Sequence, residues 1–232
     1  MIRVAMARLG EKDSHEQEAV RAHRMPRERR KQLLIEQALA HFAAKGFHAT
    51  SMQDIATAAG VTKPVIYQHF SSKRSLYLDL LGMTGEELCD RIRTATANSE
   101  SVHQQVIAGF DSFFRFAYEN RPGYELLFAS GPRRDQEFQG ALSEIEDEVA
   151  DLVTSRIEAD ISESHRRFIA LGVIALAEGT LRRWLHELDL SGAPAAAYEE
   201  TSGPMWSRRI AALAWAGLRG IQADELDRNV KE

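Results

Sequence analysis

Residues 50–73 read TSMQDIATAAGVTKPVIYQHFSSK, and this stretch decides how the rest of the chain is interpreted. Thr50 and Gln53 fit an S/T-x-x-Q capping box, a pattern with which helices begin. A small apolar face follows, and then Gly60, the residue type that most readily adopts the left-handed conformation just past a helix end. The stretch therefore predicts a short helix that starts beside Thr50 and stops at Gly60.

A second short helix is predicted over residues 63–70. Thr62 is placed to cap it, and Pro64 falls in its first turn, where a missing N–H costs little. Ile66 and Phe70 can pack inward while the polar residues between them point outward. Two short helices, a tight turn and an exposed polar face are typical of a helix-turn-helix, which reads DNA in the major groove.

The charge is unevenly distributed along the 232 residues. Residues 1–82 hold 13 Lys and Arg against 8 Asp and Glu, whereas residues 83–232 hold 16 against 26, which together give the totals of 29 and 34. A basic N-terminal part suits a polyanion such as DNA. The alternative is chance segregation of solvated charges.

The remaining composition argues against a secreted or membrane protein. The longest apolar run, residues 168–177, is shorter than the roughly 20 residues that span a bilayer. The first residues carry no apolar signal segment, and the single Cys89 cannot form an internal disulfide. We therefore expect a cytoplasmic protein that does not enter the membrane.

The apolar pattern predicts helices along the whole chain and no strand. A helix over 27–45 stops at Gly46, and further helices are expected over 72–97, 102–120, 124–129, 135–160, from Ser162 or Ser164 to 188, and 205–221. The resulting fold class is all-α, with about nine helices. A charged tail is expected over 222–232.

Residues 1–25 show no sustained helical period and predict a disordered arm. One alternative is that the arm reaches into a DNA minor groove. The other is that it is an inert extension upstream of a start at Met25. We favour an inert role for residues 1–20 and DNA contact for the basic cluster over 24–31.

The chain resembles the TetR family of bacterial transcriptional regulators over residues 27–81. The motifs that carry the resemblance are Lys45-Gly46-Phe47, Thr50-Ser51, Asp54-Ile55-Ala56, Ala59-Gly60-Val61-Thr62, Tyr67-Gln68-His69-Phe70, Lys73 and Leu76. Pro64 departs from the small residue that many members carry. Beyond residue 81 the resemblance rests on length, helix number and helix position alone.

The resemblance implies a homodimer that binds a double-stranded DNA operator. It implies a helix-turn-helix DNA-binding domain over 26–71 and a larger ligand-binding and dimerisation domain over 72–221, in which 72–97 is the connecting helix. The last two long helices would form a four-helix interface. Small residues such as Gly172 and the apolar stripe that includes Leu213 fit this, although the stripe could instead pack inside one protomer. No metal or other cofactor is expected.

By the same resemblance, the DNA-contacting residues fall into two groups. Thr50, Tyr67 and Lys73 look like phosphate contacts, with residues 27–31, beginning at Arg27, near the backbone or minor groove. The base-edge candidates are Thr62, Lys63, Gln68 and His69, with Val65 as an apolar contact to thymine methyl groups. Tyr67 could instead be a packed aromatic residue, and His69 a surface residue that stabilises its helix.

An apolar effector site is expected among the aromatic side chains of the larger domain. The candidates are Phe110, Phe113, Phe114, Tyr124, Leu127, Phe128, Phe138, Phe168, Leu181 and Trp184. Plain core packing is the alternative for each of them. Glu178, Arg182 and His186 share one helix face and could orient the polar end of a ligand, or form a surface salt bridge.

The function expected from the sequence is a transcriptional repressor released from its operator by a small, mainly apolar effector. The alternative is a DNA-binding protein without an effector, in an architectural role. The sequence contains no phosphate-binding loop, nucleophile elbow, HExxH or CxxC motif, so an enzyme is not expected.

Overall fold

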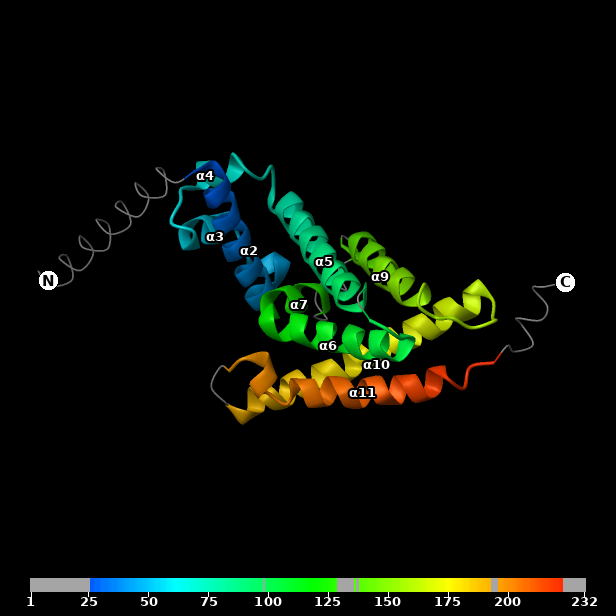
Figure 1. Ribbon diagram of the computed structural model, residues 1–232. Helices are drawn as coiled ribbons and strands as arrows, with labels where there is room; N and C mark the ends of the chain where they lie inside the picture. The colour runs from blue at the N-terminus through cyan, green and yellow to red at the C-terminus, as the bar shows by residue number, and fades with distance from the viewer. Residues whose placement is uncertain (1–25, 98, 129–135, 137, 193–195, 223–232) are drawn as a thin grey trace, which may run out of the picture. The chain divides into compact units, whose positions relative to one another are not determined.

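The computed structural model describes residues 26–97, 99–128, 136, 138–192 and 196–222. These residues form nine α-helices and one 3₁₀ turn, with no strand among them, which confirms the all-α prediction (Figure 1). None of the helices in these ranges is long and apolar enough to cross a membrane.

The chain divides into two compact units. The N-terminal unit comprises residues 1–83 and 125–139, and the C-terminal unit comprises 84–124 and 140–232. The boundary therefore falls inside α5 (Lys73–Ala97), so the first turns of the expected connecting helix belong to the N-terminal unit. Residues 125–139 join that unit as well, which the expected boundaries at 71 and 72 did not include.

The N-terminal unit is built on α2 (Arg27–Ala49), which buries one apolar stripe. Leu34, Ala38 and Phe42 on that stripe are almost completely buried. The helix is interrupted at Gly46, whose φ of 77° places it in the left-handed region, as predicted for a helix stop. The next helices are α3 (Met52–Ala58) and the short α4 (Lys63–Tyr67), and Gly60 between them has a φ of 65°.

The cap of α3 lies one residue later than the sequence pattern predicted. The Ser51 hydroxyl accepts from the Asp54 amide at 3.1 Å, and the Asp54 carboxylate accepts from the Ser51 amide at 3.0 Å, which is the reciprocal capping box. Thr50 is only 1% exposed and donates its hydroxyl to the Gly46 carbonyl at 2.9 Å. The pairing of Thr50 with Gln53 is therefore wrong, because Thr50 closes the end of α2 instead.

An aromatic cluster fills the centre of the N-terminal unit. Phe42 lies 4.9 Å from Tyr77 in an edge-on arrangement, and Phe47 lies 5.1 Å from Tyr77, between ring centroids. Phe138 is completely buried, with its ring 4.4 Å from Tyr77 and 4.7 Å from Phe47. The sequence predicts it inside a helix over 135–160, but α9 (Gln139–Thr154) begins just after it. Phe138 is thus a core residue of the N-terminal unit.

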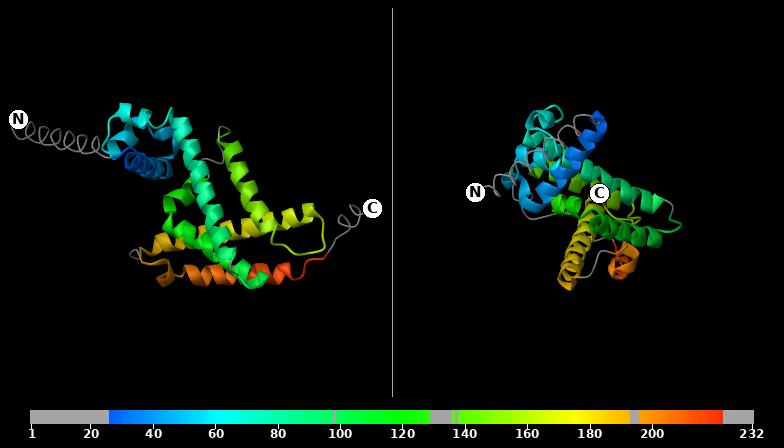
Figure 2. Two further views of the ribbon diagram at one scale, coloured as in Figure 1. Left: turned by 45° about the horizontal axis from the view of Figure 1, so that its top comes forward. Right: turned by 90° about the vertical axis from the view of Figure 1, so that its left-hand side faces the viewer.

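The C-terminal unit is a helical bundle. Its elements are the rest of α5, α6 (Val102–Glu119), the start of α7 (Arg121–Phe128), α9, α10 (Glu163–Ser191), the 3₁₀ turn η1 (Tyr198–Glu200) and α11 (Gly203–Leu218). Helix α11 packs along α6, and α10 packs on both, as the two views of Figure 2 show. Ser101 caps α6 and Ser162 caps α10, each accepting a hydrogen bond from a first-turn amide.

Several element boundaries differ from the prediction: α4 ends at Tyr67 and not at residue 70, and α11 begins and ends two to three residues earlier than expected. Residues 121–123, expected to separate the helices over 102–120 and 124–129, form the first turn of α7, because Asn120 Oδ1 accepts from the Gly123 amide at 3.0 Å and a proline is tolerated there. Helix α9 ends at Thr154 rather than near residue 160. Just after Thr154 the backbone forms tighter turns, in which the amides of Arg156 and Ile157 donate to carbonyls three residues earlier. The expected loop over 191–204 contains η1, with Tyr198 buried beneath it.

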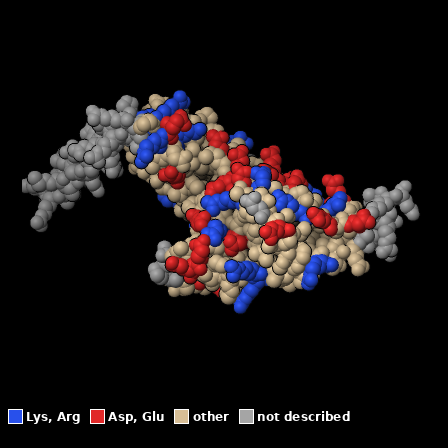
Figure 3. All heavy atoms as spheres, viewed as in Figure 1, with Lys and Arg blue, Asp and Glu red and all other residues tan. Residues whose placement is uncertain are grey.

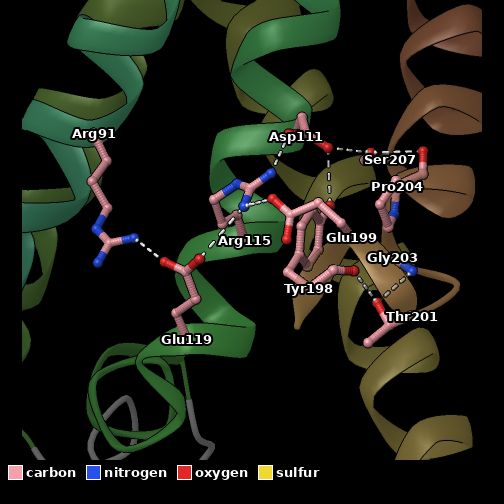
Figure 4. A network of polar contacts seen from close by, with 10 residues as sticks. All are labelled: Arg91, Asp111, Arg115, Glu119, Tyr198, Glu199, Thr201, Gly203, Pro204 and Ser207. Carbon is pink, nitrogen blue, oxygen red and sulfur yellow. Dashed lines mark hydrogen bonds and ion pairs between the residues drawn. The ribbon is translucent and has the colours of Figure 1, made fainter. Parts of the chain in front are cut away.

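A polar network fastens η1 and the start of α11 to α6 (Figure 4). Asp111 Oδ1 accepts from the hydroxyls of Tyr198 and Ser207, each at 3.0 Å. The Arg115 guanidinium lies 4.5 Å above the Tyr198 ring and pairs with Glu199 at 2.5 Å. Burial raises the pKa of Tyr198, so its hydroxyl stays a hydrogen-bond donor to Asp111.

Candidate nucleic-acid interface and ligand cavity

Helix α4 presents a polar face with an apolar underside. Ile66 is completely buried and Phe70 is 3% exposed, so the helix is held against α3 from below. The residues on the exposed face are Thr62, Lys63, Tyr67 and Gln68, whereas Val65 and His69 are half-buried. Every base-edge candidate from the sequence therefore lies on or beside one surface. A DNA contact for each of them stays a prediction.

Thr62 and Tyr67 bear on the alternatives left open by the sequence. Thr62 occupies the N-cap position of α4, as expected, but its side chain makes no capping hydrogen bond. Tyr67 is 46% exposed, which does not fit a fully packed aromatic residue. Both side chains are placed where a ligand on this surface would meet them.

Basic residues at the start of α2 lie close to the end of α4. The pKa of His69 is lowered, first by its burial and then by the positive charges of Arg27 and Arg30. Arg27, Arg29 and Lys31 are exposed. Figure 3 shows Lys and Arg side chains gathered around this part of the N-terminal unit. The predicted backbone-contacting cluster and the predicted reader helix are thus brought together.

Thr50 and Lys73, the other two predicted phosphate contacts, have structural partners. Lys73 Nζ donates to the carbonyls of Phe47 at 2.8 Å and Thr50 at 2.9 Å, and it lies 4.2 Å from the Phe47 ring centroid. The buried Thr50 hydroxyl is engaged with the end of α2. Both side chains therefore hold the junction of α2 and α3, and any phosphate contact would come in addition.

The C-terminal unit contains a cavity of about 440 Å³. Its wall is formed by the end of α5, the first half of α6, the end of α9 with the turn after it, one residue of α10 and the end of α11. The lining residues are Ile92, Thr96, Val102, Gln105, Val106, Gly109, Phe110, Leu152, Val153, Arg156, Ile157, Glu158, Ala159, Asp160, Val173, Trp215, Leu218, Arg219 and Ile221. The volume falls within the range of small-molecule sites, and most of these side chains are apolar.

Of the aromatic residues that the sequence proposed for an effector site, Phe110 lines this cavity. Most of the other proposed effector-site residues belong to the core of the bundle. The buried ones are Phe113, Phe114, Tyr124, Leu181 and Trp184, and the ring centroids of Phe114 and Trp184 lie 5.6 Å apart in a stacked arrangement. Phe128 is half-buried in the segment that belongs to the N-terminal unit. Phe168 is 74% exposed and so is not a wall of this cavity.

The sequence missed the residues that give the cavity its character. Trp215 lies on α11 outside the apolar stripe expected to form the dimer interface, and Arg156 follows the end of α9, inside a predicted continuous helix. Glu178, Arg182 and His186, proposed for the polar end of a ligand, are not among the lining residues. The described residues include no group of three or more His, Cys, Asp or Glu placed to hold a metal ion.

Two family models match the chain. The model for bacterial regulatory proteins of the tetR family matches residues 34–80, and the model for tetracyclin repressor-like C-terminal domains matches residues 102–201. The HTH-type transcriptional activator FasR of Mycolicibacterium smegmatis is 34% identical over 168 residues, which cover 72% of this chain and 77% of that protein. The negative regulator of the biofilm operon icaADBC, IcaR of Staphylococcus aureus strain Newman, is 26% identical over 110 residues, or 47% and 58% of the two chains.

Solved structures share the fold. A TetR-like transcriptional regulator from Rhodococcus sp. RHA1 superimposes with a TM-score of 0.67 at 24% identity, covering 85% of this chain and all of that one. The fatty acid degradation regulator FadR from Bacillus halodurans gives a TM-score of 0.64 at 15% identity, covering 79% and 93%. At these identities the likeness concerns the arrangement of helices.

Proposed function

Because this chain belongs to the TetR family of DNA-binding transcriptional regulators, we propose that it is a repressor released from its operator by a small, mainly apolar effector. The cavity in the C-terminal unit is the observation that carries this proposal. The cavity has the volume of a small-molecule site and an apolar wall. It lies in a different unit from the helix-turn-helix with which the family binds DNA. The relatives are regulators and not enzymes, which supports a ligand-binding site over an active site.

Helix α5 supplies a physical link for such a response. Ile92 and Thr96 near its end line the cavity, and Lys73 at its start holds the end of α2. A ligand changes DNA affinity only in proportion to its differential affinity for the DNA-binding and the released conformations. A ligand that fits the cavity better when α5 is displaced would therefore weaken operator binding.

The direction of regulation has a second candidate, activation. FasR, at 34% identity, is named as an activator, whereas IcaR, at 26%, is named as a negative regulator. Operator sites selected from random DNA, placed within or upstream of a promoter, would separate the two in transcription with purified polymerase. Reduced transcript on addition of the protein supports the repressor, and increased transcript from the upstream position supports the activator.

The effector part of the proposal needs its own experiment. A library of apolar compounds is screened for those that raise the melting temperature, since a ligand that binds only the folded state does so. Hits are then tested for release of the selected operator. If no apolar compound binds and operator affinity never changes, the protein is an effector-independent DNA-binding protein.

A homodimer is the proposed binding form. Two helices expose large apolar side chains that a monomer would leave in water: Phe168 at 74%, Leu171 at 48% and Leu190 at 73% on α10, and Met205 at 43% and Leu213 at 61% on α11. Exposed apolar patches of this kind mark protein interfaces. Two-fold pairing would place two α4 helices about one DNA turn apart, roughly 34 Å.

Sedimentation at micromolar concentration tests the dimer. Leu213→Glu puts a charge in the middle of the exposed face and should yield monomers. Met83→Glu is the matched control, because Met83 is 45% exposed but lies on α5 and not on α10 or α11. A wild-type monomer, or a dimer that survives the Leu213 change, would contradict the proposed interface.

A further inference from the structure

The half-buried polar part of the cavity wall carries a cation, whereas its carboxylates, Glu158 and Asp160, are exposed. Arg156 and Gln105 are half-buried and line the cavity from the turn after α9 and from α6. Their only mutual contact is long, with Arg156 NH1 donating to Gln105 Oε1 at 3.5 Å. Across the described residues, no carboxylate lies within ion-pair distance of Arg156, and the Gln105 side-chain amide donates no hydrogen bond.

Arg156 differs in this respect from three other arginines of the same unit. Arg91, Arg115 and Arg167 each pair with two or more carboxylates at the surface. A half-buried guanidinium without a carboxylate partner has several N–H donors that are partly desolvated and unpaired with an anion, which costs free energy. A ligand anion is one way to satisfy them.

The remaining charges of the wall lie at its solvent-facing edge. Glu158, Asp160 and Arg219 are exposed, so water screens them. Thr96 is also part of the inner wall, but its hydroxyl donates to the Ile92 carbonyl at 2.9 Å, and the rest of the inner wall is formed by apolar side chains such as Val106, Phe110 and Val173. The one charge set within the wall is therefore positive and stands next to an apolar surface.

We propose that the cavity takes an amphipathic monoanion, whose carboxylate is held by Arg156 and Gln105 and whose alkyl part lies on the apolar wall. This rests on the proposed function, in that the same cavity is the effector site. A carboxylate accepts two parallel hydrogen bonds from a guanidinium, a geometry that an ammonium or a hydroxyl group cannot offer. The side-chain amide of Gln105 would supply a further donor to the same group.

Calorimetric titration of the protein with three ligands of equal alkyl length tests which ligand charge the cavity prefers. The ligands are dodecanoate, dodecanol and dodecyltrimethylammonium, each kept below its micelle concentration. Dodecanoate should bind about tenfold or more tightly than dodecanol, since a charge-assisted hydrogen bond to a half-buried group has roughly that effect. Dodecyltrimethylammonium should bind most weakly.

Variants test whether Arg156 and Gln105 cause the preference for dodecanoate over dodecanol. Arg156→Gln should lower dodecanoate affinity about tenfold and leave dodecanol affinity unchanged. Gln105→Glu places a carboxylate beside Arg156 and should reject dodecanoate while still accepting dodecanol. Arg182→Gln is the control, because Arg182 is exposed on α10 and is not a lining residue. Should Arg156→Gln fail to fold, Gln105→Glu gives the same discrimination.

The outcomes separate this inference from the function on which it rests. Equal binding of dodecanoate and dodecanol, unaffected by either cavity variant, overturns the anion site but keeps an apolar effector cavity. Tightest binding of the cationic ligand overturns the assignment of polarity. If none of the three binds, the anion site fails and the apolar effector of the proposed function loses its support as well.

Discussion

Replacing Lys73 with methionine separates a structural role from a role in DNA binding. Methionine keeps most of the aliphatic length of lysine and removes the ammonium group. That group donates to the carbonyls of Phe47 and Thr50 and lies over the Phe47 ring. The variant therefore leaves two carbonyl oxygens at the junction of α2 and α3 without this donor, in a partly buried place.

The expected loss of stability follows from these interactions. A hydrogen bond to a charged donor contributes about 1 kcal/mol after solvent screening, and the interaction with the ring contributes about 0.5 kcal/mol. Two such bonds and one ring interaction give about 2.5 kcal/mol. For a protein of this size, 1 kcal/mol shifts the melting temperature by roughly 2–4 °C, so a decrease of about 5–10 °C is expected.

Circular dichroism melts and the salt dependence of operator binding provide the two readouts. Lys63→Met is the matched control, since Lys63 is exposed at the start of α4. It should leave the melting temperature unchanged and, if Lys63 also neutralises a phosphate, reduce the salt slope by about one. If Lys73→Met instead gives a wild-type melting temperature and a reduced slope, Lys73 binds phosphate and the stabilising role argued from its carbonyl partners is refuted.

Three further predictions concern single side chains. Tyr198→Phe removes the hydroxyl that donates to Asp111 and should cost about 1 kcal/mol, seen as a lower melting temperature; an unchanged melt would mean that the network does not hold η1. Cys89 is completely buried, and burial raises its pKa from 9.0 to about 12, so a disulfide reagent at about pH 8 should label it only after unfolding. Because the raised pKa favours the neutral thiol in the folded state, the stability it contributes below pH 9.0 should be lost as the pH rises toward 12. Gln68→Ala should change the preference at one base pair by roughly 1–3 kcal/mol, measured by competition between operators altered at single positions, whereas a uniform loss over all sites would exclude base reading.

The N-terminal helices could be predicted closely because their boundaries are encoded locally. Gly46 and Gly60 are predicted to end helices, and both adopt the left-handed conformation that favours glycine. Ile66 and Phe70 are predicted to lie beneath α4 and are buried there. Such residues are fixed by backbone geometry and by one helix face, so a short window of sequence contains what decides them.

The position of the α3 cap shows where the local pattern becomes ambiguous. Thr50 with Gln53 and Ser51 with Asp54 are overlapping capping patterns, and either could start the helix. The choice is made by tertiary structure, because the Thr50 hydroxyl is taken up by the Gly46 carbonyl and its side chain is buried. The local sequence contains both capping patterns, and it does not show which of the two hydroxyls will be engaged by another part of the structure.

The cavity was harder to predict because periodicity identifies apolar faces without identifying what covers them. Helix α10 has two such faces: Leu181 and Trp184 pack inside the protomer, whereas Phe168 and Leu171 remain exposed. All four are large apolar residues, so the sequence pattern does not separate the buried ones from the exposed ones. The aromatic candidates therefore proved to be mostly core residues and not lining residues of the cavity.

The residues that distinguish the cavity from the core lie where a regular pattern ends. The apolar period of α9 continues in sequence through Ile157, which hid the turn after Thr154 and with it the position of Arg156. A charged side chain on a continuous helix would rotate to solvent within one turn, whereas one in a tight turn can be held against apolar neighbours. An arginine close to the end of a helical pattern is therefore a more specific signal for the cavity in this chain than its phenylalanines, and the Arg156 and Gln105 variants test whether that arginine binds a ligand.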